Sequence, residues 1–110
     1  PGMIGLETAL ALSLTELGGA GGIPIREILG LLSWIPARIA GLSPDQGGPV
    51  VAGAVANLCI FDPNDSWTVE PAAMASRSRN TPYAGRKVTG RVRHTIYRGE
   101  PVVCDGQAQR

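Results

Sequence analysis

Hydrophobic positions follow a helical spacing through the first part of the chain. Leucine and isoleucine recur every three to four residues, which predicts helices over about 6–17 and 24–32 and a short third helix over 36–40. The stripe of the first helix consists of Leu6, Leu10, Leu14 and Leu17. The glycine-rich run 18–22 is a typical helix stop. Alone, three such helices would expose much of their leucine, so we expect them to be the outer layer of something larger.

The run 54–62 has the strongest strand pattern. Five of its last six residues before Asp62 are apolar or favour strands, and the run is bounded by Gly53 and Pro63. We therefore expect a core strand that is buried on both faces. The turn-forming residues 62–65 follow it, and 67–69 alternates like an edge strand.

The last third of the chain predicts further strands. Residues 87–97 and 102–103 read as a hairpin across a turn at 98–100, and 105–106 begins a polar tail. Before them, 71–75 can form one helical turn. The chain as a whole therefore predicts an α+β structure, with helices first and strands afterwards.

Composition excludes several classes of protein. A length of 110 residues allows one small domain, and a net charge of +1 with interspersed acids and bases is ordinary for a globular chain. The segment 77–98 is rich in arginine, but it carries no aromatic or motif support for nucleic-acid binding beyond Tyr83 and Tyr97. We expect no nucleic-acid partner and interpret the arginines as a solvated strand face.

Membrane and export signals are also missing from the pattern. Charged residues interrupt the apolar stretches, and no secretory signal is visible, so we expect a soluble, cytoplasmic protein with no membrane partner. Cys59 and Cys104 lie in apolar strand patterns and are expected to be buried free thiols in a reducing compartment. The chain begins at Pro1 without an initiator methionine, which suggests a processed or truncated product.

No complete active site can be assembled from the residue types. His94 is the one histidine, whereas a zinc site needs three or four ligands, so we expect a structural or surface role for it. No G-x-S-x-G motif supports a nucleophilic serine. We expect Asp62 and Asp65 to cap their turn and Glu7 to be a first-turn acid favoured by the helix dipole. The sequence predicts no catalytic residue and no metal ligand in this chain.

Five stretches of the sequence carry one family pattern: 1–8, 36–42, 53–62, 76–83 and 90–99. Their most specific elements are the Gly-Leu-Glu-Thr segment at 5–8 combined with Asn-Thr-Pro-Tyr at 80–83. Together these stretches resemble the C-terminal part of a dihydroorotase of the amidohydrolase superfamily. The resemblance covers nearly all of the chain in the expected order.

This resemblance implies a fold and an activity. It implies the last helices of a (β/α)8 TIM barrel over 1–46 and strands of a small β-sandwich over 47–110, in a metallohydrolase. The implied reaction is the zinc-dependent interconversion of N-carbamoyl-L-aspartate and dihydroorotate in pyrimidine (UMP) biosynthesis. In the family pattern all zinc ligands lie upstream of Pro1, so we expect this chain to be inactive alone and to bind no catalytic zinc.

Two residues are carried over as substrate-binding residues. Pro1 and Gly2 match the family loop after the last barrel strand, where backbone groups touch the carboxylate or ring of the substrate. Glycine suits such a close approach, although Gly2 could equally serve a turn. The segment 80–82 is interpreted as structural, and Asn57, where the family usually has aspartate, as a scaffold position.

Two alternatives stay open from the sequence. The chain could come from a non-catalytic dihydroorotase-like subunit that serves in assembly, or from a related cyclic amidase, such as a hydantoinase or an allantoinase. A free-standing small binding domain is a third reading, and it predicts cooperative unfolding of the isolated chain. For the parent, partners implied by the resemblance are its small-molecule substrate, a second copy of itself and aspartate carbamoyltransferase.

Overall fold

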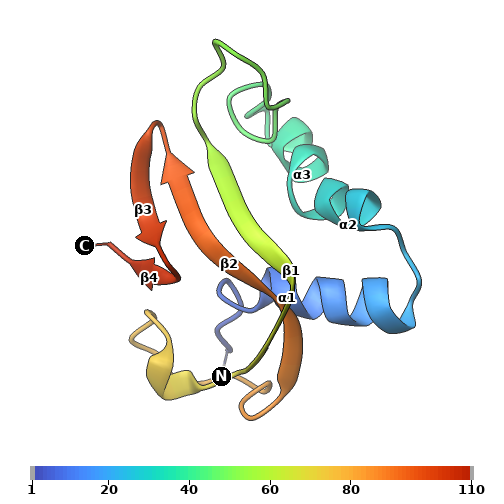
Figure 1. Ribbon diagram of the computed structural model, residues 1–110, viewed down its shortest axis with the longest axis vertical. Helices are drawn as coiled ribbons and strands as arrows, with labels where there is room; N and C mark the ends of the chain where they lie inside the picture. The colour runs from blue at the N-terminus through green and yellow to red at the C-terminus, as the bar shows by residue number, and fades with distance from the viewer. Residues whose placement is uncertain (1, 110) are drawn as a thin grey trace.

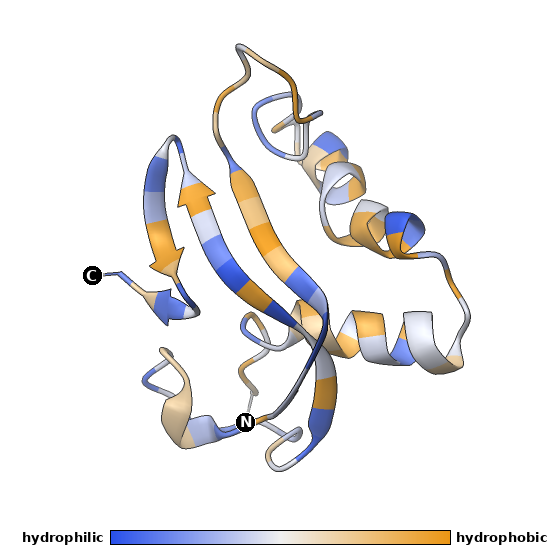
Figure 2. Cartoon of the chain, in the orientation of Figure 1, coloured by the Kyte–Doolittle hydropathy of each residue, from blue (hydrophilic) through white to orange (hydrophobic). Residues whose placement is uncertain are grey.

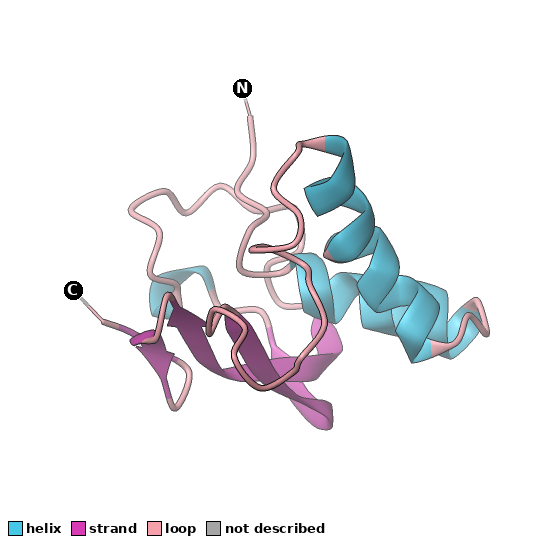
Figure 3. Cartoon of the chain, turned by 90° about the horizontal axis from the view of Figure 1, so that it is seen from above, coloured by secondary structure: helices cyan, strands magenta, loops and turns pink. Residues whose placement is uncertain are grey.

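The computed structural model describes residues 2–109, in which three α-helices precede one antiparallel sheet (Figure 1). The helical elements are α1 (Ala9–Ser13), the π-helix η1 (Leu14–Ala20), α2 (Ile25–Leu32), α3 (Trp34–Ile39) and the 3-10 turn η2 (Pro71–Ala73). The strands are β1 (Leu58–Thr68), β2 (Lys87–Tyr97), β3 (Glu100–Cys104) and β4 (Gln107–Ala108), in the spatial order β1-β2-β3-β4. The helices lie on one side of the sheet (Figure 3). The predicted α+β arrangement is confirmed.

The first helix is shifted along the chain relative to the predicted range 6–17. It begins at Ala9 and continues from α1 directly into η1, so that two glycines of the predicted stop lie inside the helix. Glycine costs about 1 kcal/mol in a helix and does not forbid one. The Gly21 N–H donates to the Glu16 carbonyl at 3.0 Å, a five-residue closure that widens the last turn, and Gly22 leaves the helix at a φ of 67°.

Small residues attach this helix to β2, together with Leu14 of the predicted leucine stripe. Ala11 is 2% exposed, whereas Leu6 is 97% exposed and lies before the helix begins. The Thr15 hydroxyl donates to the Ala11 carbonyl at 2.7 Å and accepts from the Thr89 backbone N–H at 3.0 Å. A short side chain lets the two backbones approach closely enough for this bond. The stripe prediction was therefore wrong for Leu6, whereas Leu14 lies beside Gly90 of β2.

The second and third helices are close to expectation. α2 ends at Leu32 as predicted, but α3 begins at Trp34, two residues before the predicted start at Pro36. The break between them is confined to Ser33, whose φ of −124° and ψ of −83° are not helical. Pro36 lies in the first turn of α3, where a missing N–H leaves no bond unmade.

The predicted core strand over 54–62 was wrong in both its bounds and its burial. β1 begins at Leu58 and continues to Thr68, and it is an edge strand that pairs with β2 alone within the described residues. Its burial alternates irregularly, and Cys59 and Ile60 are exposed. A continuous apolar run therefore does not indicate burial on both faces here, because part of the side-chain surface of β1 is exposed on this chain.

The predicted turn at 62–65 is a bulge within β1. Asp62 pairs with Arg91 and Ser66 with Thr89, so β1 advances four residues while β2 advances two. The extra residues accommodate Pro63, which has no N–H for a strand ladder. The expected local cap is present: the Asn64 N–H donates to Asp62 Oδ1 at 2.9 Å. Trp67 and Thr68 therefore continue the same strand instead of forming a separate one, and Val69 follows its end.

Two tight turns join the last three strands. Arg98 and Gly99 connect β2 to β3 with φ values of 48° and 81°, which confirms the predicted hairpin. Asp105 and Gly106 repeat this geometry with φ values of 49° and 77°. The predicted polar tail is therefore a second hairpin, with β4 paired to β3.

The buried core is small. Ala11, Val69 and Val88 form its centre, between the first helix and the sheet, and Ile28 and Ala37 are buried within the helices. Large apolar side chains remain exposed over α2, α3 and the segment that leads to β1, where Figure 2 shows a hydrophobic stretch.

Candidate functional site

Gly2, the described member of the predicted substrate-binding pair, has the backbone conformation that glycine favours. Its φ is 89°, and a Cβ built there would meet no atom within 4 Å. Its conformation, rather than a lack of space, therefore accounts for glycine here. The Gly2 carbonyl accepts a hydrogen bond from the Asn80 side-chain amide, and the Ile4 N–H donates to the Asn80 carbonyl at 2.9 Å. Pro1 lies outside the described residues.

Glu7 fastens the same segment to the chain at a second point. Its two carboxylate oxygens accept the backbone N–H groups of Ala75, at 2.9 Å, and of Ser76, at 3.1 Å. The predicted role as a first-turn acid was wrong, because α1 begins at Ala9 and the carboxylate faces another segment. We call residues 2–8 the N-terminal segment and residues 74–83 the 74–83 loop. No local pattern could reveal this contact, since its partners lie 68 and 69 positions apart.

The 74–83 loop is braced by its own polar groups. The Ser78 N–H donates to Ser76 Oγ at 3.2 Å, the Asn80 N–H donates to Ser78 Oγ at 3.4 Å, and the Arg79 guanidinium donates to the Ser76 carbonyl. Further along, the Tyr83 N–H donates to Thr81 Oγ1 at 3.2 Å. These bonds hold Asn80 in place, as expected for a structural segment.

A pocket of about 420 Å³ lies between the N-terminal segment and the 74–83 loop. Its lining residues are Ile4, Gly5, Leu6, Glu7, Thr8, Met74, Ala75 and Ser76. Glu7 is the one titratable group in this lining, and both of its oxygens already accept hydrogen bonds. Glu7 therefore holds the backbone of the 74–83 loop in position. The described side chains that line the pocket offer no general acid or base.

His94 lies on β2, as predicted, and interacts with the β3–β4 turn. Its Nδ1 accepts the Asp105 N–H at 3.4 Å, and its Nε2 lies 3.6 Å from Asp105 Oδ1. These contacts support the expected structural role at the surface. Within residues 2–109, no three His, Cys, Asp or Glu side chains come together in a group that could hold a metal ion.

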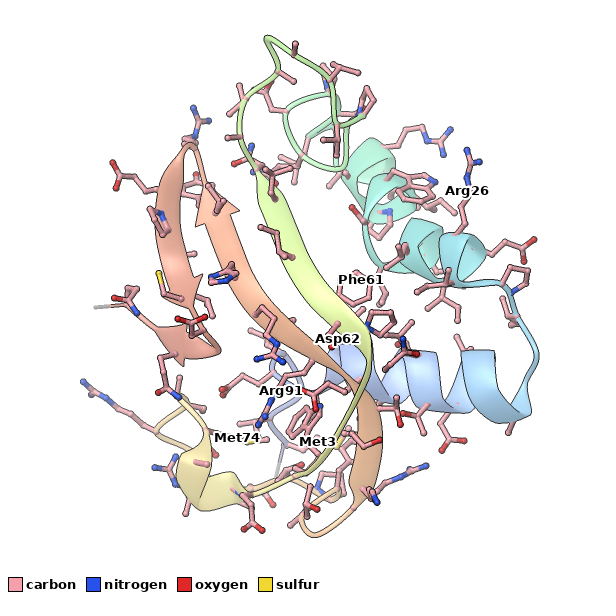
Figure 4. The ribbon with its side chains drawn as sticks, in the orientation of Figure 1. Met3, Arg26, Phe61, Asp62, Met74 and Arg91 are labelled. Carbon is pink, nitrogen blue, oxygen red and sulfur yellow. The ribbon has the colours of Figure 1, made fainter. Side chains whose placement is uncertain are left out.

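Asp65, which we predicted to cap the turn, faces two arginine side chains of β2. Its Oδ2 lies 3.5 Å from the Arg93 guanidinium and 3.9 Å from that of Arg91. Arg91 also lies over the Trp67 ring at 5.6 Å. In the register of the sheet, Arg91 of β2 lies opposite Asp62 of β1 (Figure 4). Part of the arginine-rich segment thus neutralises the bulge of β1.

Both cysteines are free thiols, as predicted, but they are less buried than expected. Cys59 is exposed and Cys104 is half-buried. Although Cys59 is exposed as a residue, its thiol is partly buried, and this burial raises the pKa of the thiol above its ordinary value because it disfavours the thiolate. A raised pKa makes Cys59 a poor nucleophile at neutral pH.

Asn57 ties together two segments on the other side of the molecule. Its Nδ2 donates to the Asp45 carbonyl at 2.8 Å, and its Oδ1 accepts the Arg98 N–H at 2.9 Å. A larger hollow of about 780 Å³ opens nearby, between α3, the loop after it and the β2–β3 turn. Asn57 is thus a scaffold residue in this structure.

None of the helices within residues 2–109 has the length and apolar character needed to cross a membrane.

Comparison with known proteins finds dihydroorotases by sequence and hydantoinases by structure. The chain is 42% identical over 107 residues to a dihydroorotase of Mycobacterium tuberculosis, which covers 97% of this chain and 25% of the relative. It is 43% identical over 106 residues to a dihydroorotase of Streptomyces coelicolor, covering 96% and 24%. The L-hydantoinase (dihydropyrimidinase) of Arthrobacter aurescens superposes with a TM-score of 0.87 at 28% identity, covering 99% of this chain and 24% of that one. No family model matches the sequence.

These relatives define the class to which the chain belongs: the amidohydrolases. Within that class, the chain is a homologue of the C-terminal portion of the dihydroorotases, as the sequence resemblance indicated. It spans about a quarter of the length of the curated relatives that it matches.

Proposed function

We propose that this chain forms the C-terminal part of a dihydroorotase, which reversibly closes N-carbamoyl-L-aspartate to dihydroorotate in the de novo synthesis of pyrimidines. The proposal rests above all on 42% identity over 97% of the chain to a dihydroorotase. The assignment of 1–46 to the last barrel helices and of 47–110 to the β-sandwich belongs to this proposal. So do a cytoplasmic location, self-association and assembly with aspartate carbamoyltransferase.

The reaction itself requires a centre that this chain does not supply among its described residues. Ring closure joins the carbamoyl nitrogen to the side-chain carboxyl carbon and releases water, and the reverse reaction adds water to the cyclic amide. In this family zinc supplies a hydroxide at neutral pH. Residues 2–109 do not fit a zinc site, since they bring no suitable ligand group together. We therefore place the zinc ligands outside this chain and assign it no step of the chemistry.

This chain contributes backbone groups at the edge of the substrate-binding site. Pro1 and Gly2 are proposed to touch the substrate through their backbone groups. Two features of Gly2 support this role: it has the positive φ of 89°, and a Cβ built on it would meet no atom within 4 Å. A backbone approach of this kind needs both an open position and a fixed conformation.

A chimaera tests the proposed function. In it, the matching quarter of the M. tuberculosis dihydroorotase is replaced by this chain. We expect the chimaera to bind zinc like the parent enzyme and to convert dihydroorotate and N-carbamoyl-L-aspartate. A folded, zinc-loaded chimaera without this activity would contradict the proposal and favour the non-catalytic assembly subunit.

Metal analysis tests the position of the zinc ligands. The purified 110-residue chain, dialysed against zinc and then against buffer, is expected to retain no stoichiometric metal. The chimaera treated in parallel is the positive control. Tightly held zinc at one or more ions per isolated chain would place a centre within this sequence and refute this part of the proposal.

A cyclic amidase of the hydantoinase or allantoinase kind is the second candidate. A specific observation favours the hydantoinase form: the TM-score of 0.87 to the L-hydantoinase of A. aurescens. Sequence identity favours the dihydroorotases, at 42% against 28%. Assay of the chimaera with a 5-substituted hydantoin in place of dihydroorotate separates the two.

A further inference from the structure

The N-terminal segment is fastened to the 74–83 loop at both ends. At one end Asn80 donates its side-chain amide to the Gly2 carbonyl and accepts the Ile4 N–H at 2.9 Å. At the other end the Glu7 carboxylate accepts two backbone N–H groups of the loop. The two strips of chain thus run in opposite directions and cannot slide past each other.

The bond from Asn80 determines which way the next peptide group faces. In a trans peptide the carbonyl and the following N–H point to opposite sides, and the one cis bond in the described residues is elsewhere. With the Gly2 carbonyl directed at Asn80, the Met3 N–H therefore faces away from the 74–83 loop. Within residues 2–109 this N–H has no acceptor, and Met3 (Figure 4) is 64% exposed.

We propose that Asn80 is a positioning residue, which fixes the Gly2–Met3 peptide so that the Met3 backbone N–H binds the carboxylate of the substrate. This inference rests on the proposed function, in which Gly2 belongs to the substrate loop. N-carbamoyl-L-aspartate and dihydroorotate both carry a carboxylate, and a backbone N–H is a strong partner for such an anion.

Glycine makes this anchor necessary. Gly2 has more accessible backbone conformations than any other residue, so an unanchored segment would lose conformational entropy on binding substrate. Asn80 and Glu7 impose that order before the substrate arrives. The affinity gained in this way comes from preorganisation and should appear in KM.

Variants of the chimaera separate this role from simple packing. Asn80→Ala removes the donor, and Asn80→Asp keeps the size but turns an acceptor toward the Gly2 carbonyl. For both we expect the KM for dihydroorotate to rise about 5- to 30-fold with little change in kcat, as for the loss of one or two kcal/mol of binding. Asn64→Ala, at the exposed bulge of β1, is the matched control and should leave KM unchanged. Full rescue by Asp would show that Asn80 only fills space and would overturn the proposal.

A second pair of variants addresses the N–H itself. Met3→Pro removes the proposed donor, whereas Met3→Ala keeps it. We expect KM to rise in the proline variant and to stay near the parent value in the alanine variant. Equal kinetics in the two would exclude the Met3 N–H as a ligand.

Amide hydrogen exchange keeps the inference testable even if the chimaera has no activity. Asn80→Ala should speed exchange in the N-terminal segment without affecting β2, while Asn64→Ala should change neither. Unchanged exchange in the N-terminal segment would overturn the positioning role. Faster exchange in an inactive chimaera would support the anchor and refute the proposed function, so the two failures are distinguishable.

Discussion

At the scale of single residues, the side chains that join distant segments differ from those that the sequence singles out. Asp62 caps the bulge through a neighbour two positions away, and this bond could be predicted. Glu7 and Asn80 bind partners 68 to 78 positions away, which spacing along the chain does not encode. Asn80 did lie within a recognisable segment, but its partner, Gly2, was not predicted.

Asn57 shows how one atom pair decides between related side chains. The family pattern has aspartate at this position, and an aspartate could still accept the Arg98 N–H through Oδ1. It could not donate to the Asp45 carbonyl, which Asn57 Nδ2 does at 2.8 Å. Asparagine is therefore the residue that satisfies both segments in this chain.

A pair of substitutions at this position gives a residue-scale prediction. In the chimaera, Asn57→Ala should speed exchange of the Arg98 amide about 5- to 10-fold, the effect of losing a bond worth about 1 kcal/mol. Asn57→Asp should preserve protection of that amide and loosen the loop around Asp45 instead. Hydrogen exchange followed by NMR or mass spectrometry measures both. Equal loss of Arg98 protection in the two variants would contradict the assigned bond pattern.

At the scale of elements, strong local signals predicted the helices and the main hairpin, and pairing decided the rest. Apolar spacing located α2, and a glycine after Arg98 located the turn after β2. Pro63 was interpreted as the end of a strand, yet β2 supports β1 on both sides of a bulge. Asp105 and Gly106 form a dipeptide typical of a hairpin turn, and this signal was available in the sequence but was interpreted as a tail.

Gly90 provides the element-scale prediction, because it is where η1 approaches β2. Its φ is 111°, and an added Cβ would lie 2.7 Å from Leu14 Cδ1. In the chimaera, Gly90→Ala should lower stability by about 1 to 3 kcal/mol through overpacking, in addition to backbone strain. Thermal unfolding measures the effect.

Gly53→Ala is the matched control for this substitution. Gly53 also has a positive φ, of 88°, but its Cβ would meet no atom within 4 Å. It should therefore show the backbone strain without the clash and melt at a higher temperature than the Gly90 variant. Equal melting temperatures would mean that the contact between helix and strand is looser than the structure indicates.

At the scale of the whole molecule, the surface is that of a part. Large apolar side chains such as Ile39, 82% exposed, and Val50, 84% exposed, lie outside the small core. Exposed apolar patches of this kind mark surfaces that pack against other structure. The leucine pattern predicted this excess, but which residues remain exposed depends on tertiary contacts that the sequence does not state.

The isolated chain is therefore expected to unfold without a cooperative transition. Its helices should melt gradually, and it should bind a hydrophobic dye, because few buried contacts oppose the loss of chain order. Circular dichroism, tryptophan fluorescence and calorimetry on the 110-residue chain test this. Coincident sharp transitions by all three methods would instead identify a free-standing domain.

The most direct test of the central claim is the substrate preference of the chimaera. The measurement is the ratio of kcat/KM for dihydroorotate to that for a 5-substituted hydantoin, compared with the same ratio for the M. tuberculosis enzyme. The account predicts a clear preference for dihydroorotate, in the same direction as the parent enzyme. A zinc-loaded chimaera that prefers the hydantoin, or that turns over neither compound, would contradict it.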